Sequence, residues 1–257
     1  ADAEDRYLAK RAETNAVVLA ASRGRQLEDL TEDRPKCMVD VRGKPLLHRL
    51  VGSFNDAGVR ELTVVTGYKS DTVEFPGIKT VENTEYETSG EVASLACASD
   101  ALNGECLVSY GDIMFRSHVL NLLLDCDADI AVVVDSNWQE ERSVTTKRTV
   151  DLVQCSHPYS ADYFDEAVAE LTRIDSSLPE SKANGEWIGL AKFSEKGSAL
   201  LQAQIDQMRE DGSLDRASMT DLFNRLIDDG AKPQVVYITG HWLDVNDAFD
   251  LARARNF

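Results

Sequence analysis

An apolar run, a helical pattern and a second apolar run follow one another within the first 66 residues, and this order strongly constrains the fold. Residues 15–20 (NAVVLA) are followed by a glycine-containing loop, as expected of a buried strand. A helical pattern then begins at Pro45 and stops at Gly58, and residues 62–66 (LTVVT) form the next apolar run. This order predicts a βαβ unit, whose crossover makes the two strands parallel and lays the helix on the sheet.

The same alternation continues along the chain and predicts an α/β fold, with one mixed, mostly parallel sheet flanked by helices. Further helices are expected at residues 91–101, 118–124, 198–208, 219–227 and 246–254, and further strands at 106–110, 130–134 and 234–239. Residues 145–190 are less regular, with strand candidates at 149–154 and 187–193. We interpret this part as a small insertion that covers the substrate.

Length and net charge limit the domain organisation and the classes of partner. A chain of 257 residues is near the upper limit for one hydrophobic core, so we expect one domain at 15–257, preceded by a charged linker or leading helix at 1–14. The formal net charge of −18 opposes binding to nucleic acid or anionic lipid, because both attract basic surfaces. No apolar segment approaches the roughly 18 residues of a membrane helix. A small anionic substrate stays compatible with this charge where basic residues or a metal reverse the local field.

The five cysteines indicate neither a zinc site nor a disulfide framework, because their number is odd and no two show C-x-x-C spacing. Cys97, Cys106 and Cys126 lie in apolar stretches and are expected to be small buried residues. This cysteine usage predicts a reducing, cytoplasmic location.

The loop after the first predicted strand concentrates positive charge in an otherwise acidic chain. It contains Arg23, Arg25, Arg34 and Lys36. Backbone N–H groups of such a loop can hold a triphosphate, while basic side chains neutralise its phosphates. We therefore predict that Lys36, with Arg23 and Arg25, contacts the phosphates of a nucleotide.

The pattern Tyr110-Gly111-Asp112 stands at the carboxyl end of a predicted strand. Open α/β sheets bind their ligands at this edge. A carboxylate there can hold Mg²⁺, which prefers hard oxygen ligands and keeps waters and substrate phosphates in its shell. Asp112 is therefore a candidate magnesium ligand, with the capping of a turn as its alternative role.

The first loop and the segment behind it resemble the nucleotidyltransferase signature L-A-A-G-x-G-x-R-L-x-P-L-T, followed by P-K and G-K-P-L. The matching residues are Leu19, Ala20, Ala21, Gly24, Leu27, Leu30, Thr31, Pro35, Lys36, Gly43, Lys44, Pro45 and Leu46. Ser22 replaces the first glycine of the signature, and Gln26 stands in place of its arginine. The resemblance implies a Rossmann-like nucleotidyltransferase fold in which Leu19, Ala20, Ala21, Ser22 and Gly24 surround the nucleotide. The two departures imply that the grip on the triphosphate moves to Arg23 or Arg25.

By the same resemblance, Asp244 matches a second metal-binding aspartate of the family, and Asn246 is then the candidate cap of the last helix. The stretch from Asn83 to Leu95 resembles the part through which cytidylyltransferases hold base and ribose. The nucleotide-binding residues assigned in this way are Asn83, Glu91 and Ser94, with Tyr110 and Gly111 from the neighbouring strand end. A turn role for Asn83 and a helix N-terminal role for Glu91 are the alternatives.

Residues 185–190 (GEWIGL) resemble the strand that meets the acceptor substrate in this family, which assigns Glu186 and Trp187 to that substrate. Trp242 is assigned to it as well, and Arg116 is a candidate to grip an acidic acceptor group. A core position for Trp187 and a solvated position for Arg116 are the alternatives.

The segments YGDIMFR, GEWIGL and GHWLDVND together look most like the cytidylyltransferase domains fused to phosphoenolpyruvate mutase in phosphonate biosynthesis, which are relatives of phosphocholine cytidylyltransferases. The resemblance implies CTP as donor, Mg²⁺ as cofactor, and 2-aminoethylphosphonate or 2-hydroxyethylphosphonate as acceptor. The charged opening resembles the linker behind the mutase, which implies a mutase domain on the N-terminal side. In the implied reaction an ionised phosphonate oxygen attacks the α-phosphorus of CTP and pyrophosphate leaves. Such a site must neutralise charge and needs no general base.

Three other functions remain open at this point. A sugar-1-phosphate nucleotidyltransferase shares the first loop, although its usual sugar-binding pattern is not found in the middle of the chain. A phosphocholine enzyme needs an aromatic cage, which Tyr86, Trp187 and Trp242 are candidates to build. A regulatory domain without catalysis fits the departures at Ser22 and Gln26, whereas Lys36, Asp112 and Asp244 argue for an enzyme.

Overall fold

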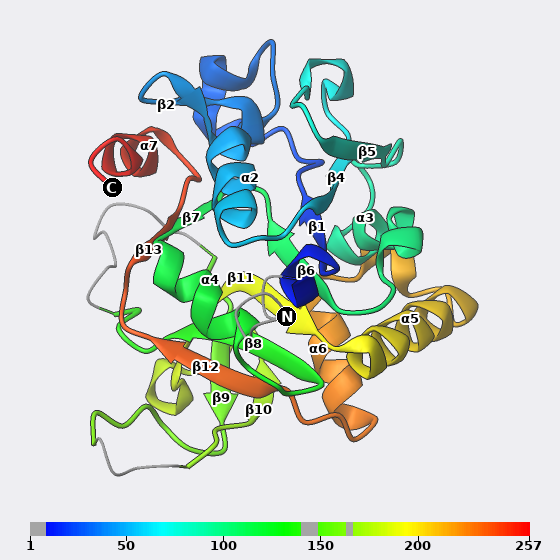
Figure 1. Cartoon of the computed structure of the whole chain (residues 1–257), viewed down its shortest axis with the longest axis vertical. Helices are drawn as coiled ribbons and strands as arrows, with labels where there is room; N and C mark the ends of the chain where they lie inside the picture. Colours follow the sequence, from blue (N-terminus) through cyan, green and yellow to red (C-terminus); the bar gives the residue numbers. More distant parts are fainter. Residues whose placement is uncertain (1–8, 140–148, 163–166) are drawn as a thin grey trace.

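The computed structural model describes residues 9–139, 149–162 and 167–257, and a nine-stranded mixed sheet runs through them (Figure 1). The strand order is β10-β9-β11-β6-β1-β4-β5, with β8 paired to β11 and β12 paired to β8. The strands of this sheet are β1 (Asn15–Leu19), β4 (Glu61–Thr66), β5 (Ile78–Glu82), β6 (Cys106–Tyr110), β8 (Ile130–Asp135), β9 (Leu152–Cys155), β10 (Leu171–Ile174), β11 (Gly185–Phe193) and β12 (Gln234–Ile238).

The parallel strands predicted from the first βαβ unit lie at the centre of the sheet. β1 pairs in parallel with β4 on one side and with β6 on the other, and β4 pairs in parallel with β5. β11 runs antiparallel to β6 and to β8. The predicted mixed sheet with a parallel centre and flanking helices is confirmed.

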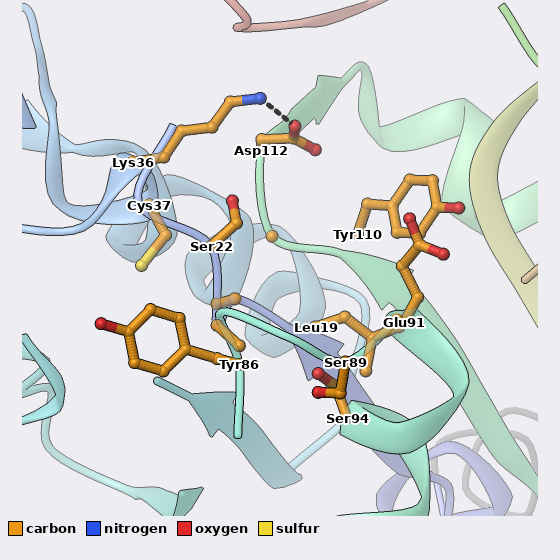
Figure 2. A pocket seen from close by; sticks show the side chains of 14 residues that line it. Leu19, Ser22, Lys36, Cys37, Tyr86, Ser89, Glu91, Ser94, Tyr110 and Asp112 are labelled. Carbon is orange, nitrogen blue, oxygen red and sulfur yellow. Dashed lines mark hydrogen bonds and ion pairs between the residues drawn. The ribbon is translucent and has the colours of Figure 1, made fainter. Parts of the chain in front are cut away.

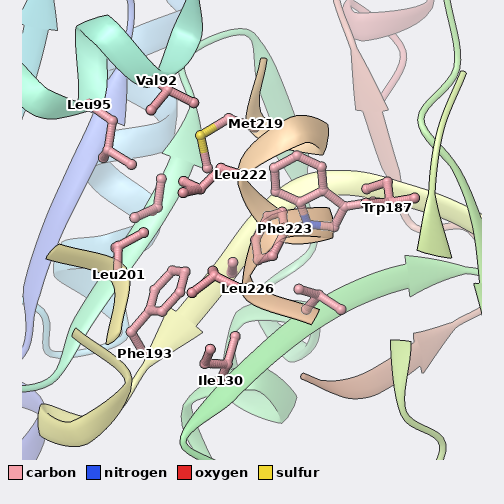
Figure 3. Packing of buried hydrophobic residues seen from close by; sticks show 14 of the residues in the cluster. Val92, Leu95, Ile130, Trp187, Phe193, Leu201, Met219, Leu222, Phe223 and Leu226 are labelled. Atoms are coloured by element: carbon pink, nitrogen blue, oxygen red, sulfur yellow. The ribbon is translucent and has the colours of Figure 1, made fainter. Parts of the chain in front are cut away.

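Side chains of β1 alternate between two hydrophobic cores, one on each face of the sheet. Val17 and Leu19 belong to the core under α3 (Glu91–Cys97), α5 (Glu195–Glu210) and α6 (Met219–Asp228), which Figure 3 shows around Phe193 and Phe223. Ala16, Val18 and Ala20 belong to the core under α2 (Leu46–Asp56) and α4 (Ser117–Leu124). Burial on both faces explains why the central strands read as continuous apolar runs.

A smaller unit sits at the edge where the central strands end. β7 (Ile113–Phe115) pairs antiparallel with β13 (Trp242–Asp244), and β2 (Asp40–Val41) pairs with β3 (Lys44–Pro45). α7 (Ala248–Ala254) packs here, since Leu251 shares a core cluster with Leu27, Val41 and Leu243. The first loop and the last helix therefore pack together beside the carboxyl edge of the sheet.

The described part of the leading segment docks against this domain. Residues 9–12 are helical, and Arg11 is only 7% exposed. Its guanidinium donates to the carbonyl of Ala57 (3.2 Å) and to Asn121 Oδ1 (2.8 Å), and it pairs with Asp125 (3.0 Å). Residues 1–8 of the predicted linker lie outside the described residues.

Several local expectations differ from the structure. β5, β7, β10 and β13 were not predicted, because each is short or alternates with polar residues. The helix expected at 91–101 ends at Cys97, and the helix expected from residue 246 begins at Ala248. Cys106 and Cys126 are buried as expected, whereas Cys97 is exposed on α3. Of the helices that the structure describes, none has the length and apolar character to cross a membrane.

Candidate functional site

Two cavities of similar size lie at the carboxyl edge of the sheet. The first has a volume of about 260 Å³ (Figure 2) and is lined by Leu19, Ala20, Ala21, Ser22, Lys36, Cys37, Tyr86, Ser89, Gly90, Glu91, Ser94, Tyr110, Gly111 and Asp112. The second has a volume of about 280 Å³ and is lined by Gln26, Glu91, Tyr110, Asp112, Ile113, Thr149, Asp151, Glu186, Trp187, Ile188, Ser218, Thr220, Trp242, Asp244 and Asn246. Glu91, Tyr110 and Asp112 line both cavities. The two cavities therefore meet at these three residues.

A series of linked polar contacts, here called the polar chain, crosses this junction. The Lys36 ammonium is paired with Asp112 Oδ2 and also donates to Asn246 Oδ1 at 2.7 Å. The Asn246 side-chain amide in turn donates to Asp244 Oδ2 at 2.6 Å. Figure 2 shows the Lys36 side chain reaching across the opening toward Asp112. Lys36 is only 8% exposed, so it is not a solvated surface lysine.

Two glycines allow the chain to close around this junction. A Cβ at Gly24, whose φ is +74°, would lie 2.7 Å from the Cβ of Lys36. A Cβ at Gly111 would lie 2.8 Å from the Cβ of Ala20 and 2.9 Å from the carbonyl oxygen of Leu19. Because real Cβ contacts are not that short, a side chain at either position would push the first loop away from Lys36 or β6 away from β1.

The β7–β13 pair brings Asp244 to Asp112. Asp244 is the register partner of Ile113, the residue after Asp112, and the backbone N–H of Val245 donates to the carbonyl of Asp112 at 2.9 Å. The expected capping role of Asn246 is wrong. Asp247 caps α7 by accepting from the backbone N–H groups of Phe249 and Asp250, which leaves the Asn246 side chain to contact Lys36 and Asp244.

Among the predicted nucleotide-binding residues, Asn83 and Gly24 do not line either cavity. Asn83 is 4% exposed, and its side-chain amide donates to Ser89 Oγ and Ser94 Oγ, both at 2.9 Å. Both hydroxyl-bearing residues line the first cavity. Asn83 thus supports the wall of this cavity from behind. It also takes the turn role that the sequence left open, because its Oδ1 accepts from the backbone N–H of Glu85 at 3.0 Å.

The arginines predicted to bind acidic groups stand apart from the junction. The guanidinium of Arg23 lies 5.3 Å from the ring centre of Tyr68, Arg25 is exposed, and neither residue lines the first or the second cavity. Arg116 stacks on the ring of Phe257 at 4.4 Å and donates to its carbonyl oxygen. Of the predicted basic residues, Lys36 alone lines either cavity, and it lines the first.

The predicted acceptor residues Glu186, Trp187 and Trp242 line the second cavity. Trp187 is also part of the core, since it is 2% exposed and lies 5.1 Å from Phe223 between ring centres. Its indole N–H donates to the carbonyl of Leu190 at 3.0 Å. The aromatic residues considered for a cage do not share one cavity, because Tyr86 lines the first.

Several lining residues were not identified from the sequence, namely Ser89, Thr149, Asp151, Ser218 and Thr220. None of them belongs to a motif at a strand end. Gln26, which departs from the signature, lines the second cavity. Gln26 is exposed, and its place in the signature is the sequence signal that could have identified it.

The carboxyl group of Glu91, at the junction, has a raised pKa. Loss of hydration is the main cause that raises the pKa of the Glu91 carboxyl, and the neighbouring Asp221 and Asp112 raise it further. The backbone N–H of Met219 donates to Glu91 Oε2 at 3.3 Å, which opposes the shift. Burial also raises the pKa of Cys37 to about 12, so this lining thiol stays protonated near neutral pH.

The donor set at the junction suits a magnesium ion that arrives with a triphosphate. The described residues contain no group of three or more His, Cys, Asp or Glu side chains that could hold a metal by themselves. Mg²⁺ is commonly bound by one or two carboxylates together with substrate phosphates. The linked carboxylates of Asp112 and Asp244 meet this requirement.

Known proteins are similar to this chain in sequence and in fold. One relative is the CTP:phosphoglutamine cytidylyltransferase of Campylobacter jejuni, 26% identical over 92% of this chain and 97% of its own length. Another is the 2-aminoethylphosphonate cytidylyltransferase of Lancefieldella rimae, 31% identical over 39% of this chain and 44% of its own length.

A solved structure, the CTP:phosphocholine cytidylyltransferase of Streptococcus pneumoniae, superposes with a TM-score of 0.65 at 20% identity, over 95% of this chain and 98% of that one. The family described as MobA-like NTP transferase domain matches residues 16–173, which include the first loop, Lys36 and Asp112. The predicted resemblance is thereby confirmed, and the chain belongs to the family of MobA-like NTP transferase domains.

Proposed function

We propose that the protein is a cytidylyltransferase that transfers CMP from CTP to a small phosphonate and releases pyrophosphate. The observation that carries the proposal is the polar chain from Lys36 and Asp112 through Asn246 to Asp244, at the junction of two cavities. A transfer between two anions needs a donor cavity, an acceptor cavity and charge neutralisation where they meet. The relatives that act on CTP support this choice of nucleotide.

In this proposal the first cavity holds CTP. Leu19, Ala20, Ala21 and Ser22 approach it through the first loop, and Ser94 with Gly90 approaches it from the start of α3. Asp112 and Asp244 would hold Mg²⁺, which supplies positive charge to the reacting phosphates when bound. Lys36 would stabilise the charge that develops on the leaving pyrophosphate. Arg23 and Arg25 would contact the triphosphate only if the first loop moved toward it.

The second cavity would hold the acceptor. Its described lining includes the carboxylates of Asp151 and Glu186, which do not line the junction, and contains no Lys or Arg. Negative side chains away from the reacting centre favour an acceptor whose far end carries an ammonium group over one that ends in a hydroxyl. Of the two predicted phosphonates, we therefore expect 2-aminoethylphosphonate to be preferred. A fused mutase domain and the predicted substrate cover stay predictions, the latter because residues 140–148 and 163–166 lie outside the described residues.

A pyrophosphate-release screen tests the proposal. The full chain with Mg²⁺ is offered each of the four ribonucleoside triphosphates against 2-aminoethylphosphonate, 2-hydroxyethylphosphonate, phosphocholine, phosphoglutamine and glucose 1-phosphate. The expected result is turnover with CTP and a phosphonate, with the amine favoured over the alcohol in kcat/KM. Better turnover with another triphosphate, or with a sugar phosphate or phosphocholine, would overturn the assignment.

Two variants test the acceptor assignment separately. Asp151→Asn and Glu186→Gln should reduce the preference for the amine over the alcohol while the KM for CTP stays within about threefold, because both residues line only the second cavity. Asp162→Asn, an exposed carboxylate outside both cavities, is the matched control. If the ratio of kcat/KM for the amine to that for the alcohol is unchanged in both variants, these carboxylates do not determine the preference for the acceptor.

A further inference from the structure

Asp135, the last residue of β8, carries a carboxylate that is 1% exposed and outside the predicted motifs. Its Oδ1 accepts hydrogen bonds from the backbone N–H groups of Asn137 and Gly240, both at 2.9 Å. Its Oδ2 accepts from the indole N–H of Trp242 at 2.8 Å. A buried carboxylate is tolerated where its oxygens are hydrogen-bonded in this way. Its partners therefore define what this residue does.

Two of the three donors flank a strained turn. Residues 239–241 connect β12 to β13, and within them Gly240 and His241 are left-handed, with φ values of 74° and 66°. His241 is a non-glycine residue in a region that L-amino acids adopt reluctantly. The Asp135 carboxylate binds the residue before His241 and the residue after it. It therefore holds the turn closed from both sides.

The held turn leads directly into the candidate metal-binding strand. Trp242 opens β13, Asp244 closes it, and Asp244 is linked to Lys36 through Asn246. The β7–β13 ladder sets the position of this strand along one edge. The hydrogen bonds to Asp135 fix the start of β13 at the turn. They also fix the Trp242 ring, which lines the second cavity.

We propose that Asp135 is a positioning residue for nucleotidyl transfer, which acts by holding the Gly240–Trp242 turn so that Asp244 and Trp242 keep their places. The kinetic part of this inference rests on the proposed function. Asp135 lines neither cavity, so it acts on the reaction through Trp242 and Asp244.

Asp135→Asn is the test, because asparagine keeps the shape but replaces one acceptor oxygen with an N–H₂ donor. Oδ1 can still accept from Gly240, whereas the amide nitrogen then faces the indole N–H of Trp242. We expect kcat to fall between about tenfold and a hundredfold, since a displacement of about 1 Å at a reacting centre has effects of this size. The KM for CTP should stay within about threefold, because the first cavity is built by other elements.

A double variant separates this role from general stability. Trp242→Phe removes the indole donor, so Asp135→Asn in that background should lower kcat several-fold less than it does in the parent. Hydrogen exchange over residues 239–245 should become faster in Asp135→Asn, a readout that needs no turnover. Asp129→Asn, at the opposite end of β8, is the matched control, since this exposed carboxylate accepts from Ser194 and Lys196.

The outcomes distinguish the two proposals. A parent protein without CTP turnover overturns the proposed function, while faster exchange at 239–245 in Asp135→Asn alone still supports the holding of the turn. Unchanged exchange and unchanged kcat overturn the role of Asp135. An equal loss of kcat in the parent and Trp242→Phe backgrounds overturns the route through Trp242.

Discussion

Lys36 and Asp112 form an ion pair across the junction of the two cavities, although 76 positions separate them in the chain. Each follows a strand of the parallel centre, and the carboxyl ends of parallel strands meet at one edge of a sheet. The lysine is buried and the carboxylate lines both cavities. The protein thus holds a cation and an anion where two charged substrates would have to meet.

Replacing Lys36 with alanine tests whether this cation assists the reaction. If it stabilises charge on leaving pyrophosphate, its contribution grows in the transition state, so kcat should fall and the KM for CTP should rise. We expect a loss in kcat/KM of at least about tenfold. Arg60→Ala is the control, because the exposed Arg60 donates to Asn55 and lines neither cavity. If kcat/KM of Lys36→Ala stays within about threefold of the parent value, as expected for Arg60→Ala, Lys36 does not assist the departure of pyrophosphate.

Asp112→Asn and Asp244→Asn should each lower turnover by at least about a hundredfold, since loss of one preorganised charge contact typically has this effect. The concentration of Mg²⁺ at half-maximal rate should rise in both variants, whereas their circular dichroism spectra should match that of the parent. Asp71→Asn provides the control, since this exposed aspartate lines neither cavity. Near-normal rates with Mg²⁺ in either site variant would contradict a two-carboxylate metal site.

Asn83→Ala should weaken CTP binding without removing the chemistry. The variant leaves the hydroxyls of Ser89 and Ser94 without the amide that holds them, and loss of a buried partner costs about 1–3 kcal/mol. The KM for CTP is expected to rise several-fold more than kcat falls, and the melting temperature should drop. Asn103→Ala, at an exposed turn, should leave KM, kcat and the melting temperature unchanged. A loss confined to kcat would place Asn83 in the reaction itself.

The raised pKa of Glu91 predicts a pH dependence of stability. In the window between the usual glutamate pKa and the raised folded value, the folded state binds more protons than the unfolded state, so the free energy of unfolding falls as pH rises. Glu91→Gln removes this dependence and should therefore lose less stability than the parent between pH 4 and neutral pH, measured by thermal melting. Glu180→Gln, at an exposed turn, is the control. Identical pH profiles for Glu91→Gln and the parent would contradict the shift.

Local sequence patterns were sufficient to predict the central strands and the helices beside them. The apolar run before the first loop, the helix from Leu46 and the strand before Gly111 could be read directly, because each depends on neighbours a few positions away. Lys36 and Asp112 were found for the same reason, since each belongs to a short motif. Tertiary contacts were needed to separate Asn83, which supports a cavity wall, from residues that line it.

The sequence by itself determined the parallel α/β sheet, the family and the loops that bear the candidate site, since the period of apolar residues and the motif spacing are local properties. Only the tertiary structure showed that Asn246 contacts Lys36, that Arg116 stacks on Phe257, and that Asp135 holds the turn before β13. These contacts join residues more than 100 positions apart, and polar side chains take partners according to what packing brings within about 3 Å. The period of apolar residues along the sequence does not indicate which distant polar side chains come this close.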